Sequence, residues 1–135
     1  MRVYYELPIN EQPVDAYEKL IESIDDVNVW RGHVQIRKID QNNRESVLAF
    51  RNKVQKEWIG SRKEDLSIVI RYGKGPLKGF QVFQVMQDKI IIMVNVRMRG
   101  LWYPFTSFAV SHILEGEIAA LRRLFPPLME QENIK

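Results

Sequence analysis

The feature that most constrains the fold is a series of apolar segments with a period of two, joined by short polar connections. Val34 and Ile36 alternate with polar neighbours, and later segments of the chain show a similar alternation of apolar and polar residues. Such alternation puts apolar side chains on one face of a strand, and short connections join neighbouring strands antiparallel. The six expected strands are one around Val34 and Ile36, then 44–53, 55–64, 67–72, 80–87 and 90–99. The sequence therefore predicts an antiparallel meander.

Helical patterns flank this meander. A short strand is expected over 2–8, and Pro13 suits the first turn of a helix whose apolar positions are Val14, Tyr17, Leu20, Ile21 and Ile24. A long helical stretch follows the meander over 104–125, and the prolines at 126 and 127 end it. The predicted order is strand, helix, six strands, long helix. This is an α+β arrangement in which about seven curved antiparallel strands wrap around the C-terminal helix, with space between helix and sheet.

The overall composition predicts one ordinary globular domain over 1–135, with about 129–135 as a flexible tail. The chain has 135 residues, 45% hydrophobic and 27% charged, and a net charge of only +3. So small an excess of basic residues is weak evidence for nucleic acid, and no nucleic-acid partner is expected. The N-terminal residues do not form the long apolar stretch of a signal peptide, so the expected location is cytoplasmic.

Residues for catalysis or metal binding are scarce. There is no cysteine, which excludes thiolate metal sites and cysteine nucleophiles. His33 and His112 have no metal-binding spacing with a second histidine or an acid. No metal, no cofactor and no catalytic residue are therefore expected.

The stretch RYGKGPLKGF at 71–80 raises the question of a phosphate-binding loop. A Walker loop needs Gly-x-x-x-x-Gly-Lys-Ser/Thr running from a strand into a helix, and a dinucleotide fingerprint also needs a helix next. Gly73, Gly75 and Gly79 do not have that spacing, and a strand pattern follows them. These glycines are better explained as positive-φ positions in a connection between two strands, with Pro76 fixing one corner.

A family resemblance rests on this turn and on the order of elements. Together with Trp30 after the first helix, Trp58 in the third meander strand and GPLKGFQVFQV at 75–85, the sequence resembles the START-like (SRPBCC) superfamily, nearest its polyketide cyclase and coenzyme-Q-binding branch. The resemblance implies the helix-grip fold, which birch-pollen-allergen-like plant proteins share. It also implies a hydrophobic cavity under the C-terminal helix. Most members bind ligands and only some catalyse, so it implies no particular activity.

Glu117 breaks the apolar pattern of the C-terminal helix. On a helical wheel it lies within a broad apolar arc that includes Ile113 and Leu121. A carboxylate facing an apolar interior must be paired, hydrogen-bonded or protonated. Two interpretations stay open. In the first, Glu117 is a structural carboxylate that either has a buried partner such as an arginine or leans out where a cleft widens. In the second, it is a polar group in the cavity that holds a ligand hydroxyl or acts as an acid or base.

The candidate cavity residues come from the helix and the strands. Large aromatics in strands usually belong to the core, but in this fold some must line the pocket, and Tyr72 has a hydroxyl that needs a partner if buried. In the last strand the residues at 90, 92, 94, 96 and 98 share one face, which should point towards the helix. The candidates are Trp30, Trp58, Tyr72, Val94, Val96, Ile113, Glu117 and Leu121.

Two basic regions have a surface interpretation. The cations Arg62, Lys63, Arg71, Lys74 and Lys78 lie around two turns and form either a solvated rim or an entrance for an anionic group. The stretch 97–105 mixes arginines with aromatic residues before the last helix, and a transient contact with a membrane or a protein is one hypothesis for it.

The expected function is binding or transport of a hydrophobic small molecule, such as a lipid, an isoprenoid quinone or a polyketide-like compound. A carrier needs no catalytic residues, which suits this chain. The first alternative is a cyclase or aromatase-like enzyme that uses Glu117 or Tyr72. The second is an adaptor for a protein partner, with side chains filling the cavity.

Overall fold

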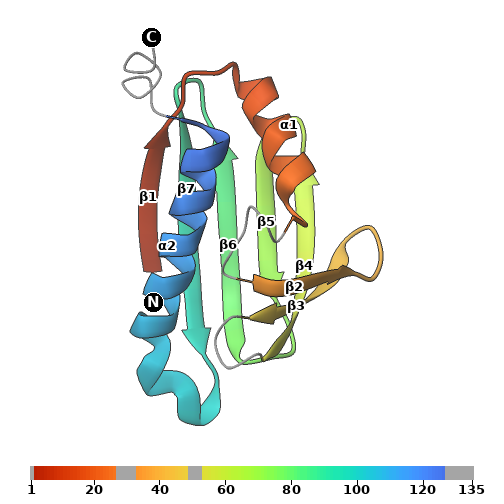
Figure 1. The fold of residues 1–135 in the computed structure, drawn as a ribbon, viewed down its shortest axis with the longest axis vertical. Helices are drawn as coiled ribbons and strands as arrows, with labels where there is room; N and C mark the ends of the chain where they lie inside the picture. Colours follow the sequence, from red (N-terminus) through yellow and green to blue (C-terminus); the bar gives the residue numbers. More distant parts are fainter. Residues whose placement is uncertain (1, 27–32, 49–52, 127–135) are drawn as a thin grey trace.

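The computed structural model describes residues 2–26, 33–48 and 53–126. These residues form one antiparallel sheet of seven strands with two helices on one face (Figure 1). Trp30 and the expected tail at 129–135 lie outside the described residues. The strands are β1 Arg2–Pro8, β2 His33–Lys38, β3 Asn43–Leu48, β4 Val54–Arg62, β5 Ser67–Tyr72, β6 Leu77–Val85 and β7 Lys89–Met98.

The sheet has the strand order β1-β7-β6-β5-β4-β3-β2, and every neighbouring pair is antiparallel. Strands β2 to β7 are therefore the predicted meander. The N-terminal strand joins it beside the last one, with Val3 opposite Val94. The first and the last strand of the chain are therefore neighbours in the sheet.

The helices follow from the predicted patterns. Helix α1 covers Pro13–Ser23, with its proline in the first turn. Helix α2 covers Thr106–Leu124 and packs on β7, so the α+β helix-grip arrangement is confirmed (Figure 1). Phe125, which precedes a proline, has non-helical backbone angles (φ −129°, ψ 78°) and ends the helix. No helix in the described part of the chain is both long and apolar enough to cross a membrane.

Several predicted boundaries were wrong by a few residues. β6 begins at Leu77 instead of residue 80, because Leu77 and its neighbours already pair with the end of β7. α2 begins at Thr106 because a short 3-10 helix, η1 Gly100–Phe105, contains Pro104 and precedes it. The predicted strand over 44–53 corresponds to β3, and its residues 49–52 lie outside the described residues.

The glycine-rich stretch is a connection between β5 and β6, as the sequence predicts. Gly75 has φ +145° in this turn. Gly79, however, lies inside β6 rather than in the turn, also with positive φ (+127°). A Cβ atom at Gly79 would lie 2.0 Å from the carbonyl oxygen of Asn95 on β7, so this glycine allows the two backbones to approach closely.

The core lies between the sheet and the helices. The predicted inward face of β7 is confirmed, since Ile90, Ile92, Val94, Val96 and Met98 are all buried. Phe83 of β6, Leu20 of α1 and Leu121 of α2 are also buried and belong to the same apolar cluster. Polar side chains within this interior are therefore conspicuous, and they define the candidate site.

Candidate functional site

Three buried polar side chains from three elements form a hydrogen-bonded row between the sheet and α2. Tyr72 lies on β5, Gln81 on β6 and Glu117 on α2. The hydroxyl of Tyr72 donates to Oε1 of Gln81 at 3.0 Å, and Nε2 of Gln81 donates to Oε2 of Glu117. None of the three is more than 8% exposed. The row thus places an amide, a phenol and a carboxyl group among the apolar residues that pack between the sheet and α2.

Local periodicity explains why these residues point inward. Gln81 alternates along β6 with exposed or half-buried residues and shares the buried face with Phe83 and Val85. Glu117 lies three and four residues before Ala120 and Leu121, so it shares their face of α2. Each polar group therefore occupies a position at which an apolar residue would ordinarily pack.

Burial dominates the electrostatics of Glu117. Desolvation raises its pKa to about 8, and the negative charge of Glu57 acts in the same direction. The hydrogen bond from Gln81 and the charge of Arg44 act the other way but do not cancel it. Glu117 forms no ion pair with any residue that the structure describes. At neutral pH the carboxyl group is therefore mostly protonated and uncharged.

Tyr72 stays protonated as well. Desolvation raises the pKa of its hydroxyl well above the ordinary value, and the charges of Glu117 and Glu57 add to this effect. Because the Tyr72 hydroxyl donates a hydrogen bond to the oxygen of the Gln81 amide, that amide is held with its nitrogen towards Glu117. The row consequently has a fixed orientation.

A charged cluster lies beside this row on β3 and β4. Nε of Arg44 donates to Oε1 of Glu57 at 2.6 Å, and Oγ of Ser46 donates to Oε2 at 2.9 Å. Nη1 of Arg44 reaches Oδ1 of Asp25 at 3.3 Å. Arg44, Ser46 and Glu57 are buried, and their mutual pairing satisfies both charges. This cluster ties the end of α1 to the sheet and sets the negative potential that Glu117 experiences.

The structure brings most of the predicted site residues into one interior. Tyr72, Val94, Val96, Glu117 and Leu121 are buried there. Ile113 is half-buried and packs against the same apolar cluster. The expectation that Glu117 has a buried partner is confirmed, but the partner is the amide of Gln81 rather than an arginine.

The structure does not place Trp58 in this interior. Trp58 alternates with the buried residues Gln55 and Glu57, so it points to the outer face of β4, where it is 38% exposed. Its ring covers the backbone of Gly60, and the guanidinium of Arg71 lies 5.2 Å from the ring centroid. The expectation that Trp58 lines a cavity was therefore wrong.

The sequence analysis missed Gln81, Arg44 and Glu57. The alternation of β6 already puts Gln81 on the face of Phe83, and this signal could have identified it. The alternation of β4 gave no such signal, because one of its faces carries Gln55 and Glu57 and the other carries Lys56 and Trp58. Which of these faces is buried depends on the rest of the sheet.

Two hollows lie away from the row. One of about 170 Å³ lies between the end of α1 and strands β2 to β4, and its lining includes Ile24, Arg44 and Ile59. The other, of about 670 Å³, is an open groove beside the β6–β7 turn, lined by residues 9–12 with Gln87 and Asp88. Neither includes Tyr72, Gln81 or Glu117.

Comparison with solved structures confirms the fold. The Zhui aromatase/cyclase from Streptomyces sp. R1128 superimposes with a TM-score of 0.74 at 8% identity, covering 92% of this chain and 93% of that one. The protein TTHA0849 from Thermus thermophilus gives 0.67 at 9% identity, with 92% of each chain covered. Ara h 8.0201 gives 0.64 at 9% identity, covering 92% and 94%.

No model of a known protein family matches the sequence, and no curated protein does either. The predicted helix-grip fold is confirmed, because the chain shares it with these three structures over nearly its whole length. At such low identity the likeness carries no residue roles.

Proposed function

We propose that this chain binds a hydrophobic small molecule between the sheet and α2, with a polar group of the ligand against the Tyr72–Gln81–Glu117 row. One observation carries the proposal: three polar side chains from separate elements converge inside an apolar interior. Keeping polar groups there costs stability, which apolar residues of similar size would avoid. Binding sites for small molecules commonly combine an apolar lining with a few placed polar groups of this kind.

The protonation state of the row indicates which ligands suit it. Below about pH 8 the carboxyl group of Glu117 is mostly uncharged. It can donate its proton to a ligand carbonyl or accept a hydrogen bond from a ligand hydroxyl. A ligand carboxylate would instead meet the negative charge of Glu57, which already disfavours ionisation of Glu117. The proposal therefore favours neutral quinones, phenols and polyketide-like compounds over ionised fatty acids.

Native mass spectrometry tests whether a ligand is bound. We expect the gently purified protein to carry an extra mass that is lost on denaturation, or the apo protein to be thermally stabilised by quinones or phenols. A clean apo mass without stabilisation by quinones, phenols or fatty acids would overturn the proposal and favour the adaptor interpretation.

A matched pair of variants tests where the ligand lies. Val94→Phe adds volume on the buried face of β7, and Met93→Phe adds the same group on the outer face next to it, where Met93 is 41% exposed. We expect Val94→Phe to weaken binding and Met93→Phe to leave it unchanged, with circular dichroism confirming that both fold. Equal binding by both variants would place the ligand elsewhere.

An enzymatic function of the cyclase or aromatase type is the second candidate. The observation that favours it is the pKa of about 8 at Glu117, which suits a group that gives and takes protons at neutral pH. One protein of the same fold is an aromatase/cyclase. Here Glu117→Gln should abolish turnover of a candidate polyketide while ligand binding and fold survive. Turnover equal to that of the unmodified protein would exclude Glu117 as the acid.

The cytoplasmic location also remains a prediction. Fractionation of cells that express the chain, followed by immunodetection, would test it.

A further inference from the structure

A cluster of exposed apolar side chains lies at one end of the molecule, where β7 leads into α2. We call this segment, residues 100–108, the apolar tip. Leu101 is 94% exposed, Phe108 66%, Tyr103 58% and Phe105 52%. Single exposed apolar residues are ordinary, but four large ones within eight positions form a patch that water solvates poorly. Figure 1 shows the tip projecting beyond the end of the sheet.

The fold holds the apolar tip rigidly. The hydroxyl of Thr106 accepts a hydrogen bond from the amide of Met98 at 3.0 Å and donates to the carbonyl of Tyr103 at 2.7 Å. The amide of Arg99 donates to the carbonyl of Pro76 at 2.8 Å. Trp102 packs against the core, so its neighbours Leu101 and Tyr103 point outward. A partner would therefore meet a preformed surface and lose little entropy by ordering it.

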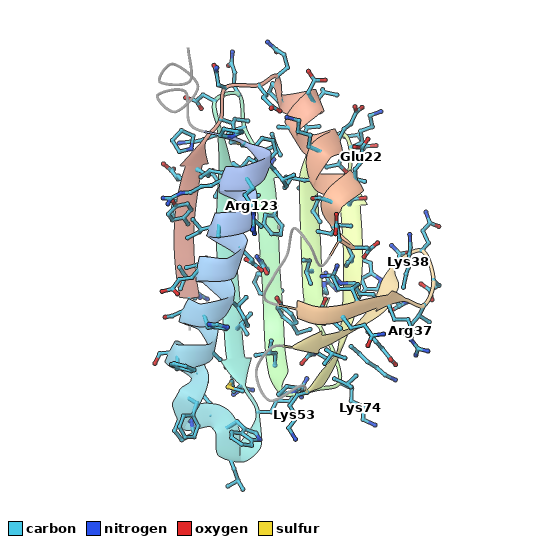
Figure 2. The ribbon with its side chains drawn as sticks, viewed as in Figure 1. Glu22, Arg37, Lys38, Lys53, Lys74 and Arg123 are labelled. Atoms are coloured by element: carbon cyan, nitrogen blue, oxygen red, sulfur yellow. The ribbon has the colours of Figure 1, made fainter. Side chains whose placement is uncertain are left out.

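Cations lie at the same end of the molecule as the apolar tip. Because Leu77 pairs with Met98, the β5–β6 turn lies at the same end of the sheet as the tip. Figure 2 shows Lys53 and Lys74 at this end. The exposed cations of this end include Lys53, Lys74, Lys78, Arg97 and Arg99. None of them forms an ion pair with a residue in the described ranges.

Acidic residues are scarce in the segments from β5 to the start of α2, which build most of this end. Between Asp65 and Glu115 the sequence contains a single acidic residue, Asp88. Asp88 lies at the β6–β7 turn, at the other end of the strands and about 30 Å away. Arg62 and Lys63 also lie at that distant end, since consecutive turns of a meander alternate between the two ends. We call the exposed cations at the end of the apolar tip the cationic rim. The sequence analysis grouped basic residues around two turns, and of these only the β5–β6 turn contributes to the cationic rim.

We propose that the apolar tip docks on the surface of an anionic lipid membrane. Leucine and aromatic side chains enter the interface between headgroups and acyl chains, while surrounding lysines and arginines attract the negative headgroups. The positive charge of the rim favours an anionic membrane over other partners. A purely apolar partner would gain nothing from the five unpaired cations, and the cations of a second copy of this chain would repel those of the first. Docking here needs no bound ligand, so it stands independently of the proposed small-molecule site.

Sedimentation with lipid vesicles tests the proposal directly. The full chain is mixed with vesicles of phosphatidylcholine alone or with phosphatidylserine added at about one part in four. We expect binding to the anionic vesicles only, with an affinity that falls as salt is raised because salt screens the rim. Failure to bind anionic vesicles, or binding that does not depend on phosphatidylserine, would overturn the proposal.

Paired variants locate the contact. Replacing both Leu101→Ser and Phe108→Ser should weaken binding at least about tenfold, because two apolar side chains no longer enter the interface. Met86→Ser removes an exposed methionine at the β6–β7 turn and should have little effect. Likewise Lys74→Glu should weaken binding about tenfold, and Lys63→Glu, an equal change of charge at the distant end, much less. Equal losses within either pair would refute docking through this end.

Insertion of the tip into the membrane can be measured with a dye attached to a single introduced cysteine, because the chain has no cysteine of its own. A polarity-sensitive dye on Leu101→Cys should shift to the blue when anionic vesicles are added, and the same dye on Met86→Cys should not. The opposite outcome is a dye signal at Leu101→Cys that shifts with protein concentration in the absence of lipid, together with a dimer in sedimentation that Leu101→Ser dissociates. The tip would then be an interface between copies of the chain, and the proposal would fail.

Discussion

The buried carboxyl group of Glu117 makes a quantitative prediction about stability. In the folded chain the pKa of Glu117 is about 8, against an ordinary value of 4.5. Between these two pH values the unfolded chain has released this proton while the folded chain still holds it. The folded state binds more protons, so the free energy of unfolding must fall as pH rises.

The size of this fall follows from the two pKa values. Each pH unit between them costs about 1.4 kcal/mol, and the loss is complete only above the folded-state pKa. From about pH 5 to pH 8 the contribution of Glu117 should therefore decrease by about 3 kcal/mol. A loss of this size is a large share of the stability of an ordinary domain.

The perturbation that tests it is Glu117→Gln, which has nearly the same shape but no charge. The oxygen of the new amide can still accept the hydrogen bond from Gln81, so the packing should survive. We expect the variant to lack this component of the pH dependence and to gain about 3 kcal/mol over the unmodified protein between about pH 5 and pH 8.

Urea unfolding at several pH values, followed by circular dichroism, measures the difference. All other titrating groups are common to both proteins, so their contributions cancel in the comparison. Glu115→Gln is the matched control, because it makes the same substitution at an exposed position of the same helix. Parallel curves for Glu117→Gln and the unmodified protein would refute the assignment of a raised pKa.

Three further predictions concern stability, each measured by urea unfolding. Gly79→Ala should cost about 3 kcal/mol or prevent folding, because its Cβ would collide with a carbonyl of β7. The control Gly100→Ala, at a glycine with φ +60° and open space around it, should cost about 1 kcal/mol, and equal costs would refute the collision argument. Glu57→Gln should cost about 3 kcal/mol, because the buried charge of Arg44 then keeps only the more exposed Asp25 as an ion-pair partner; a loss no larger than that from removing both charges of the Arg44–Glu57 pair would contradict this. Tyr72→Phe should cost about 1 to 2 kcal/mol, because the amide oxygen it serves loses its donor, and unchanged stability would show that this hydrogen bond contributes nothing.

Much of the fold could be predicted because its signals are local. The period-two segments indicated which side chains of β7 share a face, and the structure buries that face. Pro13 and the prolines from 126 onward gave the start of one helix and the end of the other. The boundaries of β6 and α2 were less accurate, because pairing with β7 and the 3-10 turn around Pro104 decide them.

The candidate site could be predicted only in part. The wheel of the last helix identified Glu117, because a carboxyl group among apolar positions is visible in the sequence itself. Trp58 was assigned to the wrong face, because both faces of β4 carry polar residues and an aromatic residue resembles a core residue in any pattern. Its ring instead lies over Gly60 and Arg71, a contact with a neighbouring strand that depends on the β4–β5 register.

The sequence by itself determined the order of strands and helices, the antiparallel meander and the presence of a carboxyl group among the apolar residues of α2. These features depend on residues close together in the chain, so periodicity and proline positions are sufficient to reveal them. Only the tertiary structure decided that Gln81 joins Tyr72 to Glu117, and that cations from the β5–β6 turn lie at the same end of the sheet as the apolar tip. Such meetings depend on strand register and on how α2 crosses the sheet, because packing of the whole core sets both.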